Sequence, residues 1–460
     1  MGRFRVGSLT VRTGCTRVPD DQRRPSAGQV LAVCAGNALQ FYDFVTYAFF
    51  APQIGRTFFP ADTPATSLLA SLATFGAGFL TRPLGALVIG RFGDRRGRKP
   101  AMLLSFALIG IGVVGLPLVP SHASLGVAAP LLVIAFRLLQ GFALGGEVGP
   151  STAFLMEAAP PLRRGLYVSL QATSADAAVC VAGLVGVALA WLLDARALDT
   201  WGWRVALLLG AVIIPFAFAA RRALTETLTL PAEEEGSADP LPIGYRRIVT
   251  LGLVLLATAT TTNYLLNYMT TYASVTLGMP AAVSFGATAV IGFSGLVCDS
   301  LGGWLSDRFG RKPVMVVPWV ILALAVFPAF RLLEALRTGA ALYGASATLA
   351  GISTLSSATV IVAITECLPR QARSGGLAII YALAISVFGG SAQFFVTWLI
   401  RATGNPLAPA WYMFTGVIVG LAALTLLTET APIKTGVVAV TTASRAIASG
   451  GRTAREEGRS

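Results

Sequence analysis

Histidine and charged side chains are scarce in this chain. Its 460 residues include one histidine and five cysteines, and only 12% are charged, whereas 55% are hydrophobic. An average soluble protein has about 25% charged residues, so the composition excludes an ordinary water-soluble globule. The cysteines show neither metal-ligand nor redox spacing and are expected to act as small packing residues. They stand at positions 15, 34, 180, 298 and 367.

Motifs for cofactor chemistry are also missing. The sequence contains no nucleotide-binding loop and no zinc-ligand pattern, so we expect no cofactor and no metal. The single histidine, His122, falls in an expected external loop, where it is a poor candidate for a proton relay. Clusters of His, Asp and Glu at catalytic spacing, which membrane enzymes use, do not occur. The sequence therefore argues against an enzyme and against the use of ATP, and favours coupling to an ion gradient.

Long uncharged runs, by contrast, recur along the whole chain, and each is long enough to cross a bilayer. They predict an all-α membrane protein with twelve transmembrane helices in two six-helix bundles. A polar stretch at 221–246 separates the bundles at 29–220 and 247–430, and residues 1–28 and 431–460 form polar tails. The expected spans are 29–51, 66–90, 100–120, 128–156, 166–193, 203–220, 247–272, 282–306, 313–331, 339–366, 374–400 and 410–428.

The net charge of +13 by itself would suit a nucleic-acid binder. Most of the 35 lysine and arginine residues, however, fall in the two tails and in the loops after the even-numbered spans. This asymmetry follows the positive-inside rule and predicts that both termini are cytoplasmic. The arginine-rich first 28 residues have no apolar core, so a cleaved signal peptide is not expected. We therefore expect an inner-membrane protein whose environment is the lipid bilayer, with no nucleic acid as a partner, and a monomer.

Two motifs of the first half return in the second half. RFGDRRGRKP at 91–100 corresponds to LSDRFGRKP at 305–313, and EAAPPLRRG at 157–165 corresponds loosely to ECLPRQARSG at 366–375. The two pairs have almost the same separation along the chain. Repetition at one offset indicates a duplicated unit, and therefore two halves with the same helix order.

The repeated charged loop predicts a gate. An aspartate at the cytoplasmic end of one helix, next to basic side chains across a short turn, can hold two helices together in one state of a transporter. The glycines allow a sharp turn and a close helix approach. A basic cluster that only sets topology is the alternative. The gating candidates are Gly90, Asp94, Arg95, Gly97 and Arg98, with Asp307, Arg308 and Arg311 in the second half.

Charges inside spans are costly and are functional candidates by default. Arg82 and Arg137 are candidate ligands for an anionic substrate, since a guanidinium binds a carboxylate with two parallel hydrogen bonds. Asp43 and Glu147 are candidate proton-coupling acids. At about 100° per residue, Arg137 and Glu147 lie within roughly 80° of each other on one helix and can face one cavity at different depths. Internal salt bridges between helices are the alternative reading for all four.

Neutral polar side chains on several spans can add hydrogen bonds to a substrate, or can bind neighbouring backbone instead. They are predicted on the first, fifth, seventh and eleventh spans. The substrate-binding candidates among them are Asn37, Gln171, Asn263, Tyr268 and Gln393, and Tyr264 and Asn267 have the same character.

The loop GRFGDRRGRKP resembles the signature of the major facilitator superfamily, and three further segments resemble its metabolite:proton symporter family. These segments are GNALQFYDF at 36–44, TRPLGALVIG at 81–90 and RLLQGFALGGEVG at 137–149. Within that family, TATTTNYLLNYMTTYA at 258–273 and ITECLPRQARSGGLAIIYALAISVFGG at 364–390 are similar to citrate and tricarballylate proton symporters. The resemblance implies two six-helix bundles around a central site and the uptake of a tricarboxylate together with protons.

The chain departs from that family at three places. Family members often have a glutamate where Gln40 stands, so the resemblance leaves the proton stoichiometry and the coupling ion open. Asp176 and Asp299 are unusual at their positions on the fifth and eighth spans. Sister branches of the family transport 2-oxoglutarate, shikimate-like acids or betaines, and these remain alternatives, as does a nutrient sensor that does not transport. A drug exporter is less favoured, because the fifth span has glycines but no proline.

Overall fold

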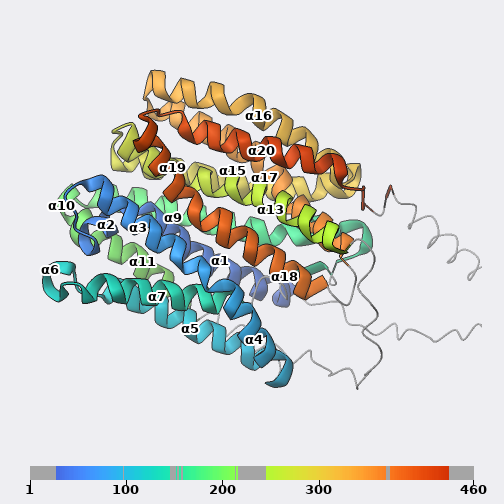
Figure 1. The fold of residues 1–460 in the computed structure, drawn as a ribbon, viewed down its shortest axis with the longest axis horizontal. Helices are drawn as coiled ribbons and strands as arrows, with labels where there is room; N and C mark the ends of the chain where they lie inside the picture. The colour runs from blue at the N-terminus through green and yellow to red at the C-terminus, as the bar shows by residue number, and fades with distance from the viewer. Residues whose placement is uncertain are drawn as a thin grey trace, which may run out of the picture.

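The computed structural model describes residues 27–96, 98–145, 159–212, 245–368 and 373–431, together with residues 152, 155, 156, 214, 215, 433 and 434. In this part of the chain the regular elements are helices, and no strand occurs. Nine helical segments in it are long and apolar enough to cross a membrane. Figure 1 shows long helices lying side by side in an elongated bundle. The all-α architecture that the apolar runs predict is confirmed.

The first half contributes six long helical regions, and its second expected span consists of two helices that meet at Thr81. Short helices cap the loops. The elements are α1 (Ala27–Phe49), α2 (Ala51–Phe58), α3 (Pro64–Leu80), α4 (Arg82–Arg96), α5 (Arg98–Leu118), α6 (His122–Leu125), α7 (Ala128–Gly145), η1 (Pro161–Arg163), α9 (Arg164–Leu192), α10 (Ala195–Ala197), η2 (Leu198–Gly202) and α11 (Trp203–Ala211).

The second half repeats this order, with π-helical segments interrupting its first and fifth spans. The elements are α13 (Tyr245–Asn267), α14 (Met269–Thr271), η3 (Tyr272–Thr276), α15 (Ala281–Phe309), α16 (Arg311–Leu336), α17 (Gly339–Cys367), α18 (Arg373–Ala384), η5 (Ile385–Gly389), α19 (Gly390–Thr403) and α20 (Ala408–Leu426).

Local sequence signals explain where several helices begin and end. The Thr63 hydroxyl accepts a hydrogen bond from the backbone N–H of Thr66, and Pro64 occupies the first turn of α3. The Thr338 hydroxyl caps α17 in the same way, accepting from the N–H of Ala341. Gly404 ends α19 with φ 65°, a left-handed conformation that glycine adopts without steric cost.

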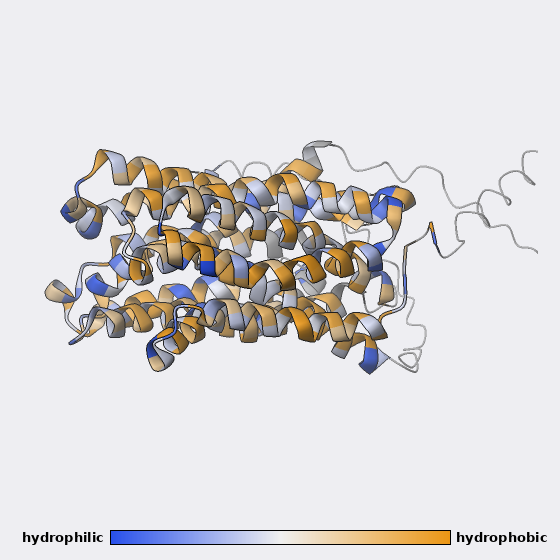
Figure 2. Ribbon diagram, turned by 90° about the horizontal axis from the view of Figure 1, so that it is seen from above, coloured by the Kyte–Doolittle hydropathy of each residue, from blue (hydrophilic) through white to orange (hydrophobic). Residues whose placement is uncertain are grey.

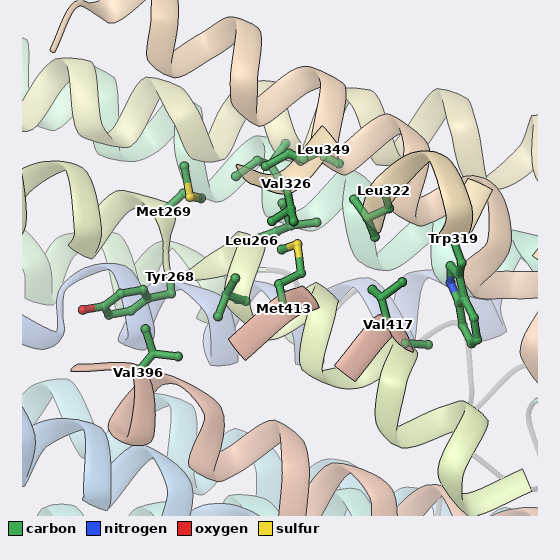
Figure 3. Packing of buried hydrophobic residues seen from close by; sticks show 14 of the residues in the cluster. Leu266, Tyr268, Met269, Trp319, Leu322, Val326, Leu349, Val396, Met413 and Val417 are labelled. Carbon is green, nitrogen blue, oxygen red and sulfur yellow. The ribbon is translucent and has the colours of Figure 1, made fainter. Parts of the chain in front are cut away.

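Each half has its own apolar core. In the second half, side chains from α13, α16, α17, α19 and α20 interlock, and Figure 3 shows ten of these residues by name. The core of the first half is rich in aromatic residues from α1, α2 and α3. Large apolar side chains also cover the outside, for example Trp191 at 80% and Leu324 at 73% exposure, and the hydropathy colouring of Figure 2 shows apolar residues along the outer helices. An apolar outer surface suits contact with lipid.

The halves meet most closely where α9 runs beside α15. Glycines make the approach possible, since a Cβ on Gly183 would overlap the backbone of Ala289, and one on Gly292 would overlap the backbone of Cys180. On the other side of the molecule, α3 meets α19, where a Cβ on Gly76 would lie 2.7 Å from the carbonyl oxygen of Gly390. Small residues that bring helix backbones together are typical of packing inside membranes. These two contacts frame the central cavity.

Candidate functional site

A central cavity lies between the two halves. It has two lobes, of which the one lined by Arg82 and Gln393 is the smaller and the one lined by Asn37 and Asp176 is the larger. Phe41 of α1, Tyr264 of α13 and Tyr381 of α18 line both lobes and so stand between them. The remaining lining comes from α1, α3, α4, α7, α13 and α19 in the smaller lobe, and from α1, α9, α13, α15, α17 and η5 in the larger lobe.

Arg82 brings positive charge to the smaller lobe. It is 9% exposed, and its guanidinium carbon lies 4.3 Å from the ring centroid of Phe79 and 5.1 Å from that of Phe44. These cation–π contacts hold the guanidinium in place. Its Nε donates to no acceptor in the described part of the chain. Among the described residues, Arg82 is the one cation that lines the cavity. Of the two arginines predicted to bind an anion, Arg82 therefore lies in the cavity wall.

Arg137 and Asp43 form a buried ion pair behind that wall. The Nη1 of Arg137 lies 3.4 Å from the Oδ2 of Asp43 and donates to the Oε1 of Gln140 at 2.8 Å. The guanidinium also lies 3.7 Å from the ring centroid of Tyr47. Arg137 is fully buried and is not among the residues lining either lobe. In this conformation Arg137 contacts Asp43 and does not reach the cavity surface.

The predicted neutral ligands divide between the two lobes. Gln393 lines the smaller lobe; it is 1% exposed, and neither its Nε2 nor its Oε1 has a hydrogen-bond partner in the described residues. Asn37 and Gln171 line the larger lobe, where the Asn37 amide donates to the Gln171 carbonyl at 2.7 Å. Asn263 also lines the larger lobe and accepts from the Nδ2 of Asn267 at 3.1 Å.

Tyr268 has a different position. It belongs to the apolar core of the second half, and its hydroxyl accepts a hydrogen bond from Thr397 at 3.0 Å. It lines neither lobe. Tyr264, four residues earlier, lines both lobes instead, and α13 ends at Asn267 between the two tyrosines.

Tyr381 and Phe41 are cavity residues that sequence reasoning did not select. Neither side chain carries a charge or an amide, and Phe41 is overlooked beside Gln40 and Asp43. Gln40, noted only as a departure from a family pattern, lines the smaller lobe as well. A signal does exist near Tyr381, since the π-helical segment η5 begins four residues later, and π-helical turns often mark functional sites.

The loop after the eighth span forms a link between the halves. The Asp307 carboxylate accepts hydrogen bonds from the backbone N–H groups of Gly165 and Leu166 at 2.8 and 2.9 Å. These groups belong to the first turn of α9, where the helix dipole favours a negative charge. Arg311 donates to Asp307 at 2.8 Å and binds Glu366 through two further hydrogen bonds at 3.0 and 3.2 Å.

A second carboxylate anchors the start of α16. Glu429 accepts from the backbone N–H groups of Arg311 and Lys312 at 2.8 and 3.0 Å. Partial burial of Glu429 by itself raises its pKa, but the backbone donors around it outweigh burial and lower the pKa below its ordinary value. Glu366 receives one more hydrogen bond from the Thr430 hydroxyl at 2.7 Å. Four charged groups, Asp307, Arg311, Glu366 and Glu429, are therefore joined in one network at this end of the molecule.

The other gating candidates have separate positions. Arg308 is exposed and stacks on Trp304, with 5.5 Å between the guanidinium carbon and the ring centroid, and it takes no part in the network. The structure describes only the backbone of four further candidates, namely Gly90, Asp94, Arg95 and Arg98. Gly97 and the proton-coupling candidate Glu147 lie outside the described residues.

Comparisons with known proteins place the chain in a family. A family model of sugar and other transporters matches residues 29–239. A citrate–proton symporter of Salmonella typhi is 34% identical over 415 residues, which cover 89% of this chain and 95% of that protein. A citrate–proton symporter of Klebsiella pneumoniae is 35% identical, with 86% and 90% covered. The chain belongs to the major facilitator superfamily.

The relatives and the fold agree on the kind of protein. An alpha-ketoglutarate permease of Escherichia coli is 32% identical and covers 87% of this chain and 93% of that one. The proton:xylose symporter XylE has a TM-score of 0.72 at 18% identity, over 88% of this chain and 96% of that one, and supports the fold. The major facilitator fold and the assignment to metabolite:proton symporters, which the motifs predict, are confirmed. The protein is a multi-pass membrane transporter.

Proposed function

We propose that this transporter imports citrate or a related tricarboxylate together with protons, by alternating access around the central cavity. The buried guanidinium of Arg82 at the wall of the smaller lobe is the observation that carries the proposal. A fixed cation in a site shielded from water can bind a carboxylate, because the guanidinium is already held in place and a charge-assisted hydrogen bond in a low-dielectric site offsets the loss of solvation.

Hydrogen-bond donors beside Arg82 complete the proposed substrate site. The Gln393 amide is buried without a partner in the described residues, so a substrate oxygen can accept from it without breaking another hydrogen bond. Asn267 and Tyr264 contribute further polar atoms to the same lobe. One guanidinium does not balance the charge of three carboxylates. Transport of protons with the substrate lowers that imbalance, in agreement with symport.

The ion pair of Asp43 and Arg137 supports proton coupling. Protonation of Asp43 releases Arg137, which then has no anionic partner in the described residues. Arg137 stays in the proposal as a residue that senses this protonation from behind the cavity wall. Glu147, the second acid expected to couple protons, keeps that proposed role on the basis of its sequence position next to this region.

We further propose that the network around Asp307 closes the cytoplasmic side. This assignment rests on the arginine-rich loops, which the positive-inside rule places in the cytoplasm, and it puts both termini in the cytoplasm of an inner-membrane monomer. Closure there ties the start of α9 in the first half to the end of α15 in the second half. The bundle boundaries at 29–220 and 247–430 are part of the same proposal.

A proteoliposome assay tests the substrate proposal. Labelled citrate, tricarballylate, 2-oxoglutarate and betaine are offered with an imposed inward proton gradient. We expect citrate or tricarballylate to accumulate, and Arg82→Ala to abolish this uptake. Arg82→Lys keeps the charge but not the two-pronged geometry, and should transport poorly. The control is Arg56→Ala, which removes an exposed arginine paired with Asp199. Normal citrate uptake by Arg82→Ala would refute the role of Arg82.

A zwitterion importer is the second candidate. Phe41, Phe44, Phe75, Tyr264 and Tyr381 surround the smaller lobe with aromatic rings, and aromatic faces attract quaternary ammonium groups. Arg82 would then bind the single carboxylate of the zwitterion. Accumulation of betaine without accumulation of citrate in the same assay would favour this candidate.

A further inference from the structure

Two aspartates from opposite halves meet across the α9–α15 contact. Asp176 lies in the middle of α9 and is 6% exposed, and Asp299 lies in α15 and is 1% exposed. The Asp176 carboxylate lies against α15 at Gly295, one helical turn before Asp299. Both line the larger lobe of the cavity. The pair thus joins the two halves at the point where the cavity wall is shared between them.

The local sequence leaves room for this pair. Gly295 lies opposite Asp176, and a Cβ at this glycine would overlap the Asp176 carboxylate. One turn away from the pair, the hydroxyls of Thr173 and Ser300 form a second hydrogen bond between the halves at 2.9 Å. The small residues and the polar link hold α9 and α15 close together around the two carboxyl groups.

Among the described residues, no arginine, lysine or histidine forms an ion pair with either aspartate. The Oδ1 of Asp299 is buried, and in this part of the chain it has no hydrogen-bond partner. The titratable groups that face the pair are Cys180 on α9, Cys298 on α15, Tyr264 on α13 and Tyr381 on α18. The other polar residues of this lobe are neutral, namely Asn37, Gln171, Thr260, Asn263 and Ser357.

Carboxyl groups on two facing helices can form a hydrogen bond with each other only if one of them carries a proton, because an ionised carboxylate only accepts. Two adjacent carboxylates without a cation do not both stay ionised in a buried site, and such pairs titrate as a unit. We propose that Asp176 and Asp299 bind one shared proton, and that this proton locks the α9–α15 contact between the halves. The site is additional to the Asp43–Arg137 pair, which lines neither lobe.

The shared proton gives a second coupling step. With the proton in place, the pair carries one negative charge and one hydrogen bond that holds the halves together. When the proton leaves to water in the opened cavity, two negative charges face each other and favour separation of α9 from α15. The closed contact therefore binds the proton more tightly than the open one, and this difference links proton release to opening. This coupling rests on the symport proposed above, whereas the proton site itself does not.

Infrared spectroscopy of the purified protein in lipid tests the site without any substrate. We expect a carbonyl band of a protonated carboxyl group at neutral pH, and its loss in the double variant Asp176→Asn/Asp299→Asn. In the single variant Asp299→Asn, Asp176 has no acidic neighbour, so the band should titrate away at lower pH than in the parent. This single variant also serves if the double variant does not fold. Asp199→Asn, at an exposed salt bridge, is the control and should leave the band unchanged.

Transport measurements test the coupling separately. We expect the double variant to carry one proton fewer per citrate than the parent. A parent without the band, or a band that persists in the double variant and is unshifted in Asp299→Asn, would overturn the proton site. Absence of the band together with sodium binding that the double variant loses would also overturn the proton site, in favour of a cation site. If the band behaves as expected but citrate is not transported, the symport proposal fails and the proton site stands.

Discussion

Asp307 accepts a 2.8 Å hydrogen bond from the backbone N–H of Gly165. Asp307 lies at the end of α15 in the second half, and Gly165 lies at the start of α9 in the first half. The sequence predicts a gate in this loop. Arg311 donates a hydrogen bond to Asp307 and another to Glu366 at the end of α17. A carboxylate that caps a helix of the other half binds only while the halves are closed on that side. In the proposed gate, this contact stabilises the state that is closed on that side over the open one.

Asp307→Asn should lower the rate of substrate exchange much more than substrate affinity. An amide is a weaker acceptor for two helix N–H groups and loses the charge contact with Arg311, so the closed state becomes less populated. Exchange rates in proteoliposomes and binding by calorimetry separate the two effects. Asp94→Asn, in the corresponding loop of the first half, should behave in the same way. A folded variant without binding would argue against a purely conformational role.

Asp43→Asn should retain citrate exchange but lose accumulation driven by a proton gradient, because the amide cannot bind and release a proton. The same separation is expected for Glu147→Gln. Uptake with and without an imposed pH gradient distinguishes accumulation from exchange. Accumulation at the parent level by either variant would show that its acid is only structural.

Arg137→Ala should abolish citrate transport and destabilise the protein by about 3–5 kcal/mol, the usual cost of leaving a buried charge unpaired. Removing both charges with Asp43→Asn/Arg137→Gln should restore most of the thermal stability in detergent but not the proton-driven uptake. Arg137→Lys should also transport weakly, because the lysine cannot contact Asp43 and Gln140 with the same geometry. Normal transport by Arg137→Ala would contradict the coupling role.

Gly292→Ala should weaken the contact between the halves, since its new methyl group meets the backbone of Cys180. Overpacking of this kind costs about 1–3 kcal/mol, and a lower melting temperature together with slower exchange is expected. Gly344→Ala is the matched control, because no atom lies within 4 Å of a Cβ there. Equal melting temperatures for the two variants would show that α9 and α15 are not held as closely as the glycines indicate.

Glu429 should make the protein more stable at neutral than at acidic pH. Its folded-state pKa is lowered, so its contribution is present above the ordinary pKa of about 4.3 and is lost as the pH falls through the lower folded value. Glu429→Gln should therefore reduce the melting temperature at pH 7 and have a smaller effect at pH 4. Equal effects at both values would contradict the role of the ionised carboxylate.

Sequence reasoning located the polar groups of the site better than their arrangement. Arg82, Gln393, Asn37, Gln171 and Asn263 all line the cavity, because polar side chains in apolar spans have few other places to go. Tyr268 instead packs in the core, and Arg137 pairs with Asp43 behind the wall. Helix periodicity sets the azimuth of a side chain but not which neighbouring helix it meets, so it could not decide between these positions.

The sequence by itself determined the helices, the duplicated halves and the charged loops, because hydrophobic run length and charge placement act locally along the chain. Only the tertiary structure decided which charges meet. Asp176 and Asp299 are over a hundred residues apart, and so are Asp307 and Gly165. Their contacts depend on glycines that let α9 and α15 approach, and that approach is a property of two packed surfaces, which neither helix specifies alone.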